Sequence, residues 1–180
     1  MKKCLMLMSN GFEEAEAVAV IDVLRRCGLE LDTCSITGNC ELESARGIKI
    51  RTDKKLSELI FNEYDAVIFP GGSQNANSLE DSEKVIEIVR DFNSKNFLIA
   101  AICAAPGVLK KAGILKGKNA TSYPGILSKS DCIYSEKSVV KDGNMITSRG
   151  AATAFEFAFG IAEYLGMAEI ADKVRKDMLF

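Results

Sequence analysis

Short apolar segments alternate with amphipathic segments along most of this 180-residue chain. Continuous apolar runs of about four to eight residues are typical of buried strands, whereas apolar residues three and four positions apart mark one face of a helix. The runs KCLMLMS, YDAVIFPGG and NFLIAAI therefore predict buried strands. Helical spacing predicts helices over the ranges 13–27, 82–93, 153–165 and 168–178. The alternation favours an α/β fold with a mostly parallel sheet, formed by one domain over residues 1–180.

Less regular segments complete this prediction. LELDTCSIT indicates a second strand, GIKIRTD a short strand that is half of a hairpin, and KKLSELIF a short helix. SEKSVVKDGNMITSRG indicates two strands around an Asp-Gly turn.

The ends of the predicted strands carry the candidate chemistry, because ligands bind α/β sheets at the carboxyl ends of their parallel strands. One strand ends in SNGFEEAE, one in Pro70-Gly71-Gly72 and one at Cys103. The acidic residues of the first loop would repel a flavin phosphate, and no Asp ends the central strand as in a phospho-receiver. The G-x-G-x-x-G and P-loop motifs are also absent. The groups that remain as candidates for chemistry at the strand ends are a cysteine, a carboxylate and glycine backbone amides.

Cys103 lies where a strand is expected to stop and a helix to start. Ala101, Ala104 and Ala105 give it the small neighbours that a nucleophile elbow needs, and Pro106 is tolerated in the first turn of a helix. A helix N-terminus favours the thiolate and would lower the thiol pKa. The alternative is an inert buried cysteine. The elbow context favours a reactive Cys103, and the other five cysteines are expected to be inert.

Glu16 has apolar neighbours on both sides in EAEAVAV. If it points beneath the strand ends it lies beside Cys103, where burial would favour a protonated carboxyl that donates a hydrogen bond to the thiolate. Alternatively, Asn10 and Glu13 form a capping box, and the acidic residues only favour the start of a helix. Residue pattern alone leaves both interpretations of Glu16 open.

Other residues also have two interpretations. Gly71 and Gly72 form either a plain turn or a close approach that lets their N–H groups, with that of Ala104, form an oxyanion hole. Arg46 and Arg149 either orient a substrate or are ordinary solvated charges.

Composition narrows the classes of function. Lys and Arg number 23 and Asp and Glu 25, a net charge of −2, and without a basic block nucleic acid is not expected as the main ligand. No apolar run is long enough to span a bilayer, and no export signal or C-x-x-C pair appears, so a cytoplasmic protein with reduced thiols and without a metal or cofactor is expected. The chain has no histidine, which excludes Cys-His and Ser-His-Asp catalysis.

Four segments, GFEEAEAV, VIFPGG, AAICAAPGVL and TSRGAATAFEFA, together resemble the ThiJ/PfpI superfamily, and within it the branch of the Parkinsonism-associated protein deglycase. The resemblance implies a flavodoxin-like three-layer α/β sandwich and a homodimer. It also implies that Cys103 is an oxidation-sensitive nucleophile, that Glu16 is its partner, and that Gly71, Gly72 and Ala104 supply backbone amides.

The same resemblance implies a glyoxalase or deglycase that acts, without glutathione, on methylglyoxal or glyoxal and their early adducts. Arg46 and Arg149 would orient the substrate. A non-catalytic redox sensor or redox-regulated chaperone, and an amidase or peptidase, are the alternatives. Tyr123 stands where the family usually has a histidine. A phenol with a pKa near 10 is a poor base at neutral pH, which weakens the peptidase alternative most.

Overall fold

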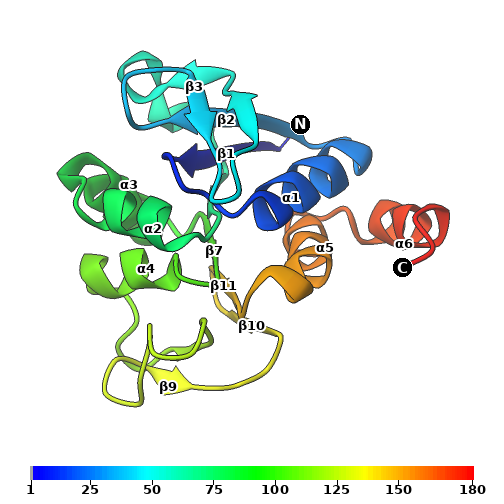
Figure 1. Ribbon diagram of the computed structural model, residues 1–180. Helices are drawn as coiled ribbons and strands as arrows, with labels where there is room; N and C mark the ends of the chain where they lie inside the picture. Colours follow the sequence, from blue (N-terminus) through cyan, green and yellow to red (C-terminus); the bar gives the residue numbers. More distant parts are fainter. Residues whose placement is uncertain (1) are drawn as a thin grey trace.

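A seven-stranded sheet forms the centre of the computed structural model, which describes residues 2–180 (Figure 1). Neighbouring strands pair in parallel, except the antiparallel pair at one edge. Across the sheet the strands are β10 (Val139–Asp142), β11 (Met145–Ser148), β7 (Leu98–Ile102), β6 (Ala66–Phe69), β1 (Lys3–Met8), β2 (Glu30–Ser35) and β5 (Lys54–Lys55).

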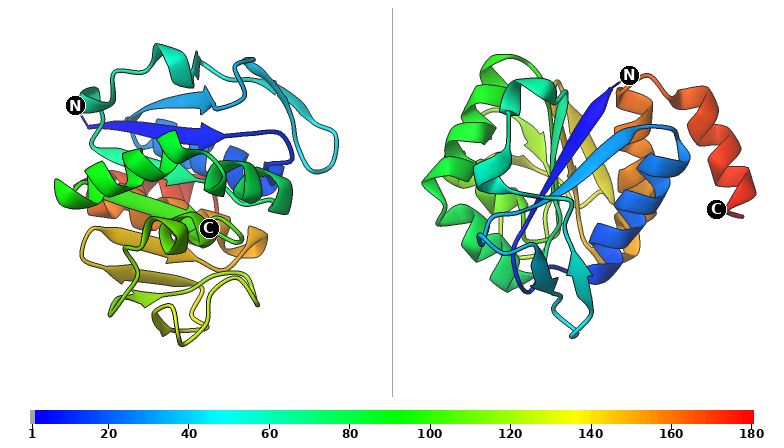
Figure 2. Two further views of the ribbon diagram at one scale, coloured as in Figure 1. Left: turned by 90° about the vertical axis from the view of Figure 1, so that its left-hand side faces the viewer. Right: turned by 90° about the horizontal axis from the view of Figure 1, so that it is seen from above.

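Helices cover both faces of this sheet (Figures 1 and 2). One face packs against α1 (Glu14–Arg26) and α5 (Ala154–Tyr164), with α6 (Ala168–Asp177) outside them. The other face packs against α2 (Ser73–Glu80), α3 (Glu83–Ser94) and α4 (Pro106–Ala112). Each helical layer forms its own hydrophobic core with the sheet. The predicted α/β sandwich with a mostly parallel sheet is therefore confirmed.

The apolar strands are explained by this double coverage. All five residues of β7 and all four of β6 are buried, because side chains on both faces of the sheet meet a helical layer. Helix α3 has the opposite pattern, with one apolar face against the sheet. It begins after Ser82, whose hydroxyl accepts a hydrogen bond from the Val85 N–H group.

Two segments differ from the prediction. KKLSELIF does not form a regular helix, since Lys54 and Lys55 pair with the end of β2 and only 3-10 turns follow, at Leu56–Glu58 and Phe61–Glu63. Helix α2 was not expected, because its sequence SQNANSLE is mostly polar and buries only three residues. Two further short strands, β8 (Asn119–Ala120) and β9 (Ile133–Tyr134), form a separate pair.

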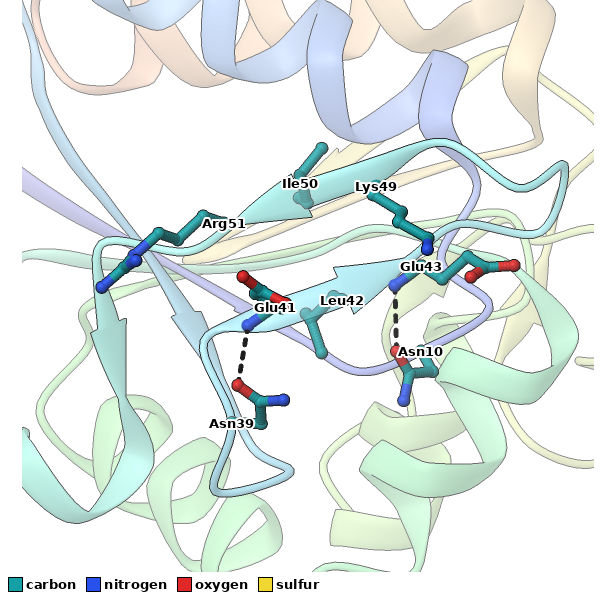
Figure 3. Close-up of a pocket in the computed structure, with 8 residues that line it drawn as sticks. All are labelled: Asn10, Asn39, Glu41, Leu42, Glu43, Lys49, Ile50 and Arg51. Atoms are coloured by element: carbon teal, nitrogen blue, oxygen red, sulfur yellow. Dashed lines mark hydrogen bonds between the residues drawn. The ribbon is translucent and has the colours of Figure 1, made fainter.

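A small hairpin, β3 (Glu41–Glu43) and β4 (Lys49–Arg51), lies over the loop that follows β1 (Figure 3). The Asn39 and Asn10 side-chain oxygens accept hydrogen bonds from the Glu41 and Glu43 N–H groups, and the Gly11 N–H group donates to the Glu43 carbonyl. The bonds that Asn10 and Gly11 make with Glu43 hold the end of β3 beside the loop that follows β1.

The same contacts overturn the predicted capping box. The Asn10 side chain is bound to the hairpin, and Glu13 is the N-cap residue of α1 without a side-chain hydrogen bond.

Candidate active site

The three unusual strand ends lie side by side. Strands β7, β6 and β1 are consecutive in the sheet and parallel, so their carboxyl ends share one edge. Cys103 follows β7, Gly71 and Gly72 follow β6, and Glu16 is in the first turn of α1, which follows β1. The edge therefore brings a thiol, a carboxyl group and two glycine peptides together.

Cys103 occupies a tight turn between β7 and α4. Its backbone is left-handed, with φ of 65°, a conformation that residues other than glycine seldom adopt. Its N–H group donates to the Ser148 carbonyl at 2.9 Å, and its carbonyl accepts from the Tyr123 N–H group at 2.8 Å. The half-buried side chain lines a cavity of about 450 Å³.

The two glycines are required by close packing. A Cβ atom on Gly71 would lie 2.5 Å from Oε2 of Glu16 and 2.6 Å from Cβ of Cys103. Gly72 has φ of 92°, and a Cβ atom there would collide with the Gly11 carbonyl. Only glycine fits at either position.

The N–H groups of these glycines have different partners. That of Gly71 donates to Oε2 of Glu16 at 2.7 Å, so it does not face the cavity as an oxyanion donor, which corrects the prediction for this residue. The N–H groups of Gly72 and Ala104 both donate toward the sulfur of Cys103.

Glu16 is fully buried, 0% exposed. Burial raises its pKa to about 7, against the opposing effect of the Gly71 N–H group. Within residues 2–180, its Oε1 atom has no well-aligned hydrogen-bond partner, although the Cys103 thiol is close enough to lower the Glu16 pKa through a hydrogen bond. Burial thus acts in the direction expected from the sequence and favours the protonated carboxyl group.

The thiol behaves differently from the prediction. Burial raises the pKa of Cys103 to about 12, and the neighbouring Glu16 carboxylate contributes to this rise. The N–H groups of Ala104 and Gly72 oppose it but do not outweigh it. The prediction that the start of α4 lowers the thiol pKa is therefore wrong while Glu16 is ionised. Two negative charges so close together in a buried site disfavour each other. The carboxylate is instead placed to take the thiol proton.

The remaining candidates are only partly gathered at the cavity. Arg46 lines it, with Nη1 3.5 Å from Oε2 of Glu13, and Tyr123 lines it with a ring that is largely exposed. Arg149 is outside the lining, and its guanidinium binds the carbonyl and the carboxylate of Glu136 instead.

Sequence reasoning also missed part of the wall. The other residues that line the cavity come from the loop after β1, the hairpin tip, the start of α2 and the segment after Tyr123. They are Gly11, Glu13, Ala45, Ser73, Gln74 and Ile126. Nothing in the polar sequence of α2 marks Ser73 and Gln74 as lining residues.

Two further findings concern the residues that the structure describes. Residues 2–180 contain no group of three or more His, Cys, Asp or Glu side chains arranged to hold a metal ion. Within the same range, every helix is too short or too polar to cross a membrane.

The fold and the site together define an α/β sandwich that carries a cysteine on a strand-to-helix elbow, with a buried glutamate beside it. The model of the DJ-1/PfpI family matches residues 2–164. The chain belongs to this family, as the resemblance of its four segments indicated.

Individual relatives agree with this assignment. Protein dj-1beta of Drosophila melanogaster is 40% identical over 181 residues, 99% of this chain and 97% of that protein, and its crystal structure matches with a TM-score of 0.93. The Parkinson disease protein 7 homolog of Danio rerio is 38% identical over 183 residues, 99% of this chain and 97% of its own length. The oxidized DJ-1 of Toxoplasma gondii is 34% identical, with a TM-score of 0.94 over 100% of this chain and 99% of its own.

Replacing Gly72 with alanine tests the close packing at the cavity. Gly28 also has a positive φ, but a Cβ atom there meets nothing within 4 Å, so Gly28→Ala is a matched control. We expect Gly28→Ala to lower the free energy of unfolding by about 1 kcal/mol, the usual cost of this backbone conformation. Gly72→Ala should cost clearly more and slow the alkylation of Cys103, as measured by denaturation and iodoacetamide labelling. Equal effects of the two variants would contradict the packing argument.

The raised pKa of Glu16 makes stability depend on pH. In the unfolded chain the carboxyl group ionises near pH 4.5, and in the folded protein near pH 7. The folded state binds the extra proton between these values, so its stability falls as pH rises from about 4.5 through 7. The loss amounts to about 3 kcal/mol. Glu16→Gln should remove this loss, so that the free energy of unfolding of the wild type, relative to the variant, declines from pH 4 to pH 8. A constant difference would show that Glu16 ionises normally.

Proposed function

We propose that this protein is a glutathione-independent glyoxalase and deglycase that acts on methylglyoxal or glyoxal and on their early adducts. The observation that carries the proposal is the contact between the Cys103 thiol and a buried carboxyl group whose pKa is about 7, at the wall of an open cavity. A base with a pKa near the operating pH is suited to moving protons in both directions.

The first step forms a bond between the Cys103 sulfur and the aldehyde carbon of methylglyoxal. The Glu16 carboxylate takes the thiol proton as the sulfur attacks, which avoids the high cost of a free thiolate beside a second negative charge. The aldehyde oxygen becomes negative, and the N–H groups of Gly72 and Ala104, which lie at the sulfur, stabilise it. Glu16 then returns the proton to this oxygen and leaves a hemithioacetal.

The second step moves a hydrogen within the adduct. The Glu16 carboxylate removes the proton from the carbon bonded to sulfur and delivers it to the adjacent carbonyl carbon. The hemithioacetal hydroxyl gives its proton to the oxygen of that carbonyl, so this oxygen becomes a hydroxyl and the carbon bonded to sulfur becomes a carbonyl. The product is a lactoyl thioester. Water, with Glu16 as base, hydrolyses the carbon–sulfur bond to give lactate and the free thiol. The sum is methylglyoxal plus water to lactate, with no external oxidant, reductant or cofactor.

Deglycation uses the same groups on a different bond. An early adduct of methylglyoxal is a hemithioacetal or an aminocarbinol that is in equilibrium with the free aldehyde. Transfer of its aldehyde carbon to Cys103 releases the original thiol or amine with the proton from Glu16, and the steps above follow. The open cavity, most of whose wall comes from loops and turns, is accessible to a modified side chain.

A redox sensor is the second candidate, supported by the oxidized state of the Toxoplasma gondii relative. A peroxide would convert the Cys103 thiol to a sulfenic acid with release of water, and a second peroxide would give the sulfinic acid. The Gly72 and Ala104 N–H groups and a protonated Glu16 are donors for the sulfinate oxygens. An amidase or peptidase is less suited to this site, because the chain has no histidine to form the Cys-His pair on which cysteine peptidases rely.

A methylglyoxal assay separates these functions. We expect Cys103→Ser to reduce lactate formation to background, and Glu16→Gln to reduce it by about a hundredfold or more, as is typical when a general base is removed. Cys40→Ser is the matched control, because Cys40 is the other half-buried cysteine and lies outside the cavity. It should retain wild-type activity. A wild-type protein that forms no lactate, while peroxide still oxidises Cys103, would favour the redox sensor.

Tyr123 should be dispensable for turnover. Its backbone N–H group donates to the Cys103 carbonyl, and the residue is 55% exposed. Tyr123→Phe leaves the backbone bond intact, so we expect less than a threefold change in kcat for methylglyoxal. A loss of about a hundredfold would assign a proton-transfer role to the phenol.

A further inference from the structure

Asn75, in the first turn of α2, is a buried polar residue at the site for which the mechanism above gives no role. Its side chain is 0% exposed and uses its whole amide group. Oδ1 accepts a hydrogen bond from the Ser9 N–H group at 2.6 Å. Nδ2 donates to the carbonyls of Pro70 at 2.8 Å and Gly71 at 3.2 Å. The opposite orientation of the amide would place an oxygen against two carbonyls, so only this one satisfies its partners.

The two carbonyls held by Asn75 belong to the two peptide units that serve the site. A peptide unit is planar, with its C=O and N–H bonds pointing in opposite directions. The N–H group opposite the Pro70 carbonyl is that of Gly71, which donates to Glu16. The N–H group opposite the Gly71 carbonyl is that of Gly72, which donates toward the Cys103 sulfur. The Asn75 side chain therefore fixes the direction of two N–H groups, one that donates to Glu16 and one that donates toward Cys103.

The surroundings make this restraint necessary. The turn consists of a proline and two glycines, and Gly72 has φ of 92°, so the chain itself restrains these peptides weakly. Besides Asn75, the Gly71 carbonyl accepts only the Glu13 N–H group at 3.0 Å among the hydrogen bonds of the described residues. The Ser9 bond also ties the turn to the end of β1, from which α1 and Glu16 follow.

We infer that Asn75 is a positioning residue, which orients the Gly71 and Gly72 N–H groups and thereby sets how easily Cys103 and Glu16 exchange their proton. The inference concerns the pair on which the proposed function rests, but it does not require that methylglyoxal is the substrate. Asn75 itself does not line the cavity and touches no reacting atom.

Without the hydrogen bonds that Asn75 donates to the Pro70 and Gly71 carbonyls, the N–H groups on these peptides should bind the Glu16 carboxylate and the Cys103 thiolate less well. The Gly71 bond favours the ionised Glu16, and the Gly72 bond favours the Cys103 thiolate. Both groups would therefore titrate at higher pH. The other charged or titratable groups at the cavity are Glu13, Arg46 and Tyr123, and the side chain of Asn75 makes no hydrogen bond to any of them.

The test is the rate of iodoacetamide labelling of Cys103 against pH, read by peptide mass mapping. In Asn75→Ala we expect the midpoint of the profile to rise by about one pH unit, and the rate at pH 7 to fall about tenfold. Asn75→Asp keeps the acceptor for Ser9 and, when ionised, loses both donors and adds a negative charge, so it should shift the profile in the same direction and at least as far. Asn77→Ala, two residues along α2 on its exposed side, is the matched control and should match the wild type.

Thermal unfolding of each variant distinguishes positioning from a purely structural role. A folded Asn75→Ala or Asn75→Asp whose profile coincides with that of the wild type would overturn the inference, as would an equal shift in Asn77→Ala.

A measurement on the wild type covers the case in which neither Asn75 variant folds. The NMR signals of the Asn75 side-chain amide should move with pH at the same midpoint as Cys103 labelling, and signals that stay constant would overturn the inference. None of these measurements depends on turnover of methylglyoxal. The inference about Asn75 and the proposed glyoxalase activity can therefore fail independently of each other.

Discussion

Cys103 adopts a left-handed backbone conformation that costs a residue other than glycine roughly 1 to 2 kcal/mol. The conformation persists because two backbone hydrogen bonds, from Cys103 to Ser148 and from Tyr123 to Cys103, hold the turn on both sides. It places the half-buried side chain at the cavity wall, against the edge of the core that α1 and α5 form with the sheet. The neighbouring turn must then approach closely, which is why Gly71 and Gly72 have no room for a Cβ atom.

This close approach also determines the electrostatics. The sulfur and the Glu16 carboxyl group share a space with little water, where one negative charge is stabilised by backbone N–H groups and a second is strongly disfavoured. The two groups therefore titrate as a coupled pair, and the properties of either depend on the proton of the other. In the proposed mechanism the thiol need not be ionised beforehand, because the carboxylate accepts its proton during the attack.

The sequence predicted the elements that depend on a strong local pattern. The apolar runs of β1, β6 and β7 identified the central strands, and the small residues around Cys103 identified the elbow. It could not predict that the Gly71 N–H group points to Glu16 and the Gly72 N–H group to the sulfur, because that direction depends on contacts with Asn75, a residue in a polar segment without periodicity. The distance of Arg149 from the cavity was equally inaccessible, since it depends on the pairing with Glu136 across an irregular loop.

The tyrosine at position 123 is explained by the same arrangement. The backbone of this residue supports the elbow through its N–H group, a contact that any residue except proline can make. The residue lines the cavity but is largely exposed, in contrast to the fully buried Glu16. In the proposed mechanism, proton transfer is supplied by a carboxyl group that burial has brought to a pKa of about 7, within the range that a histidine would otherwise provide. A chain with no histidine can therefore retain an acid–base group at neutral pH, provided that the packing around Glu16 remains closed to water.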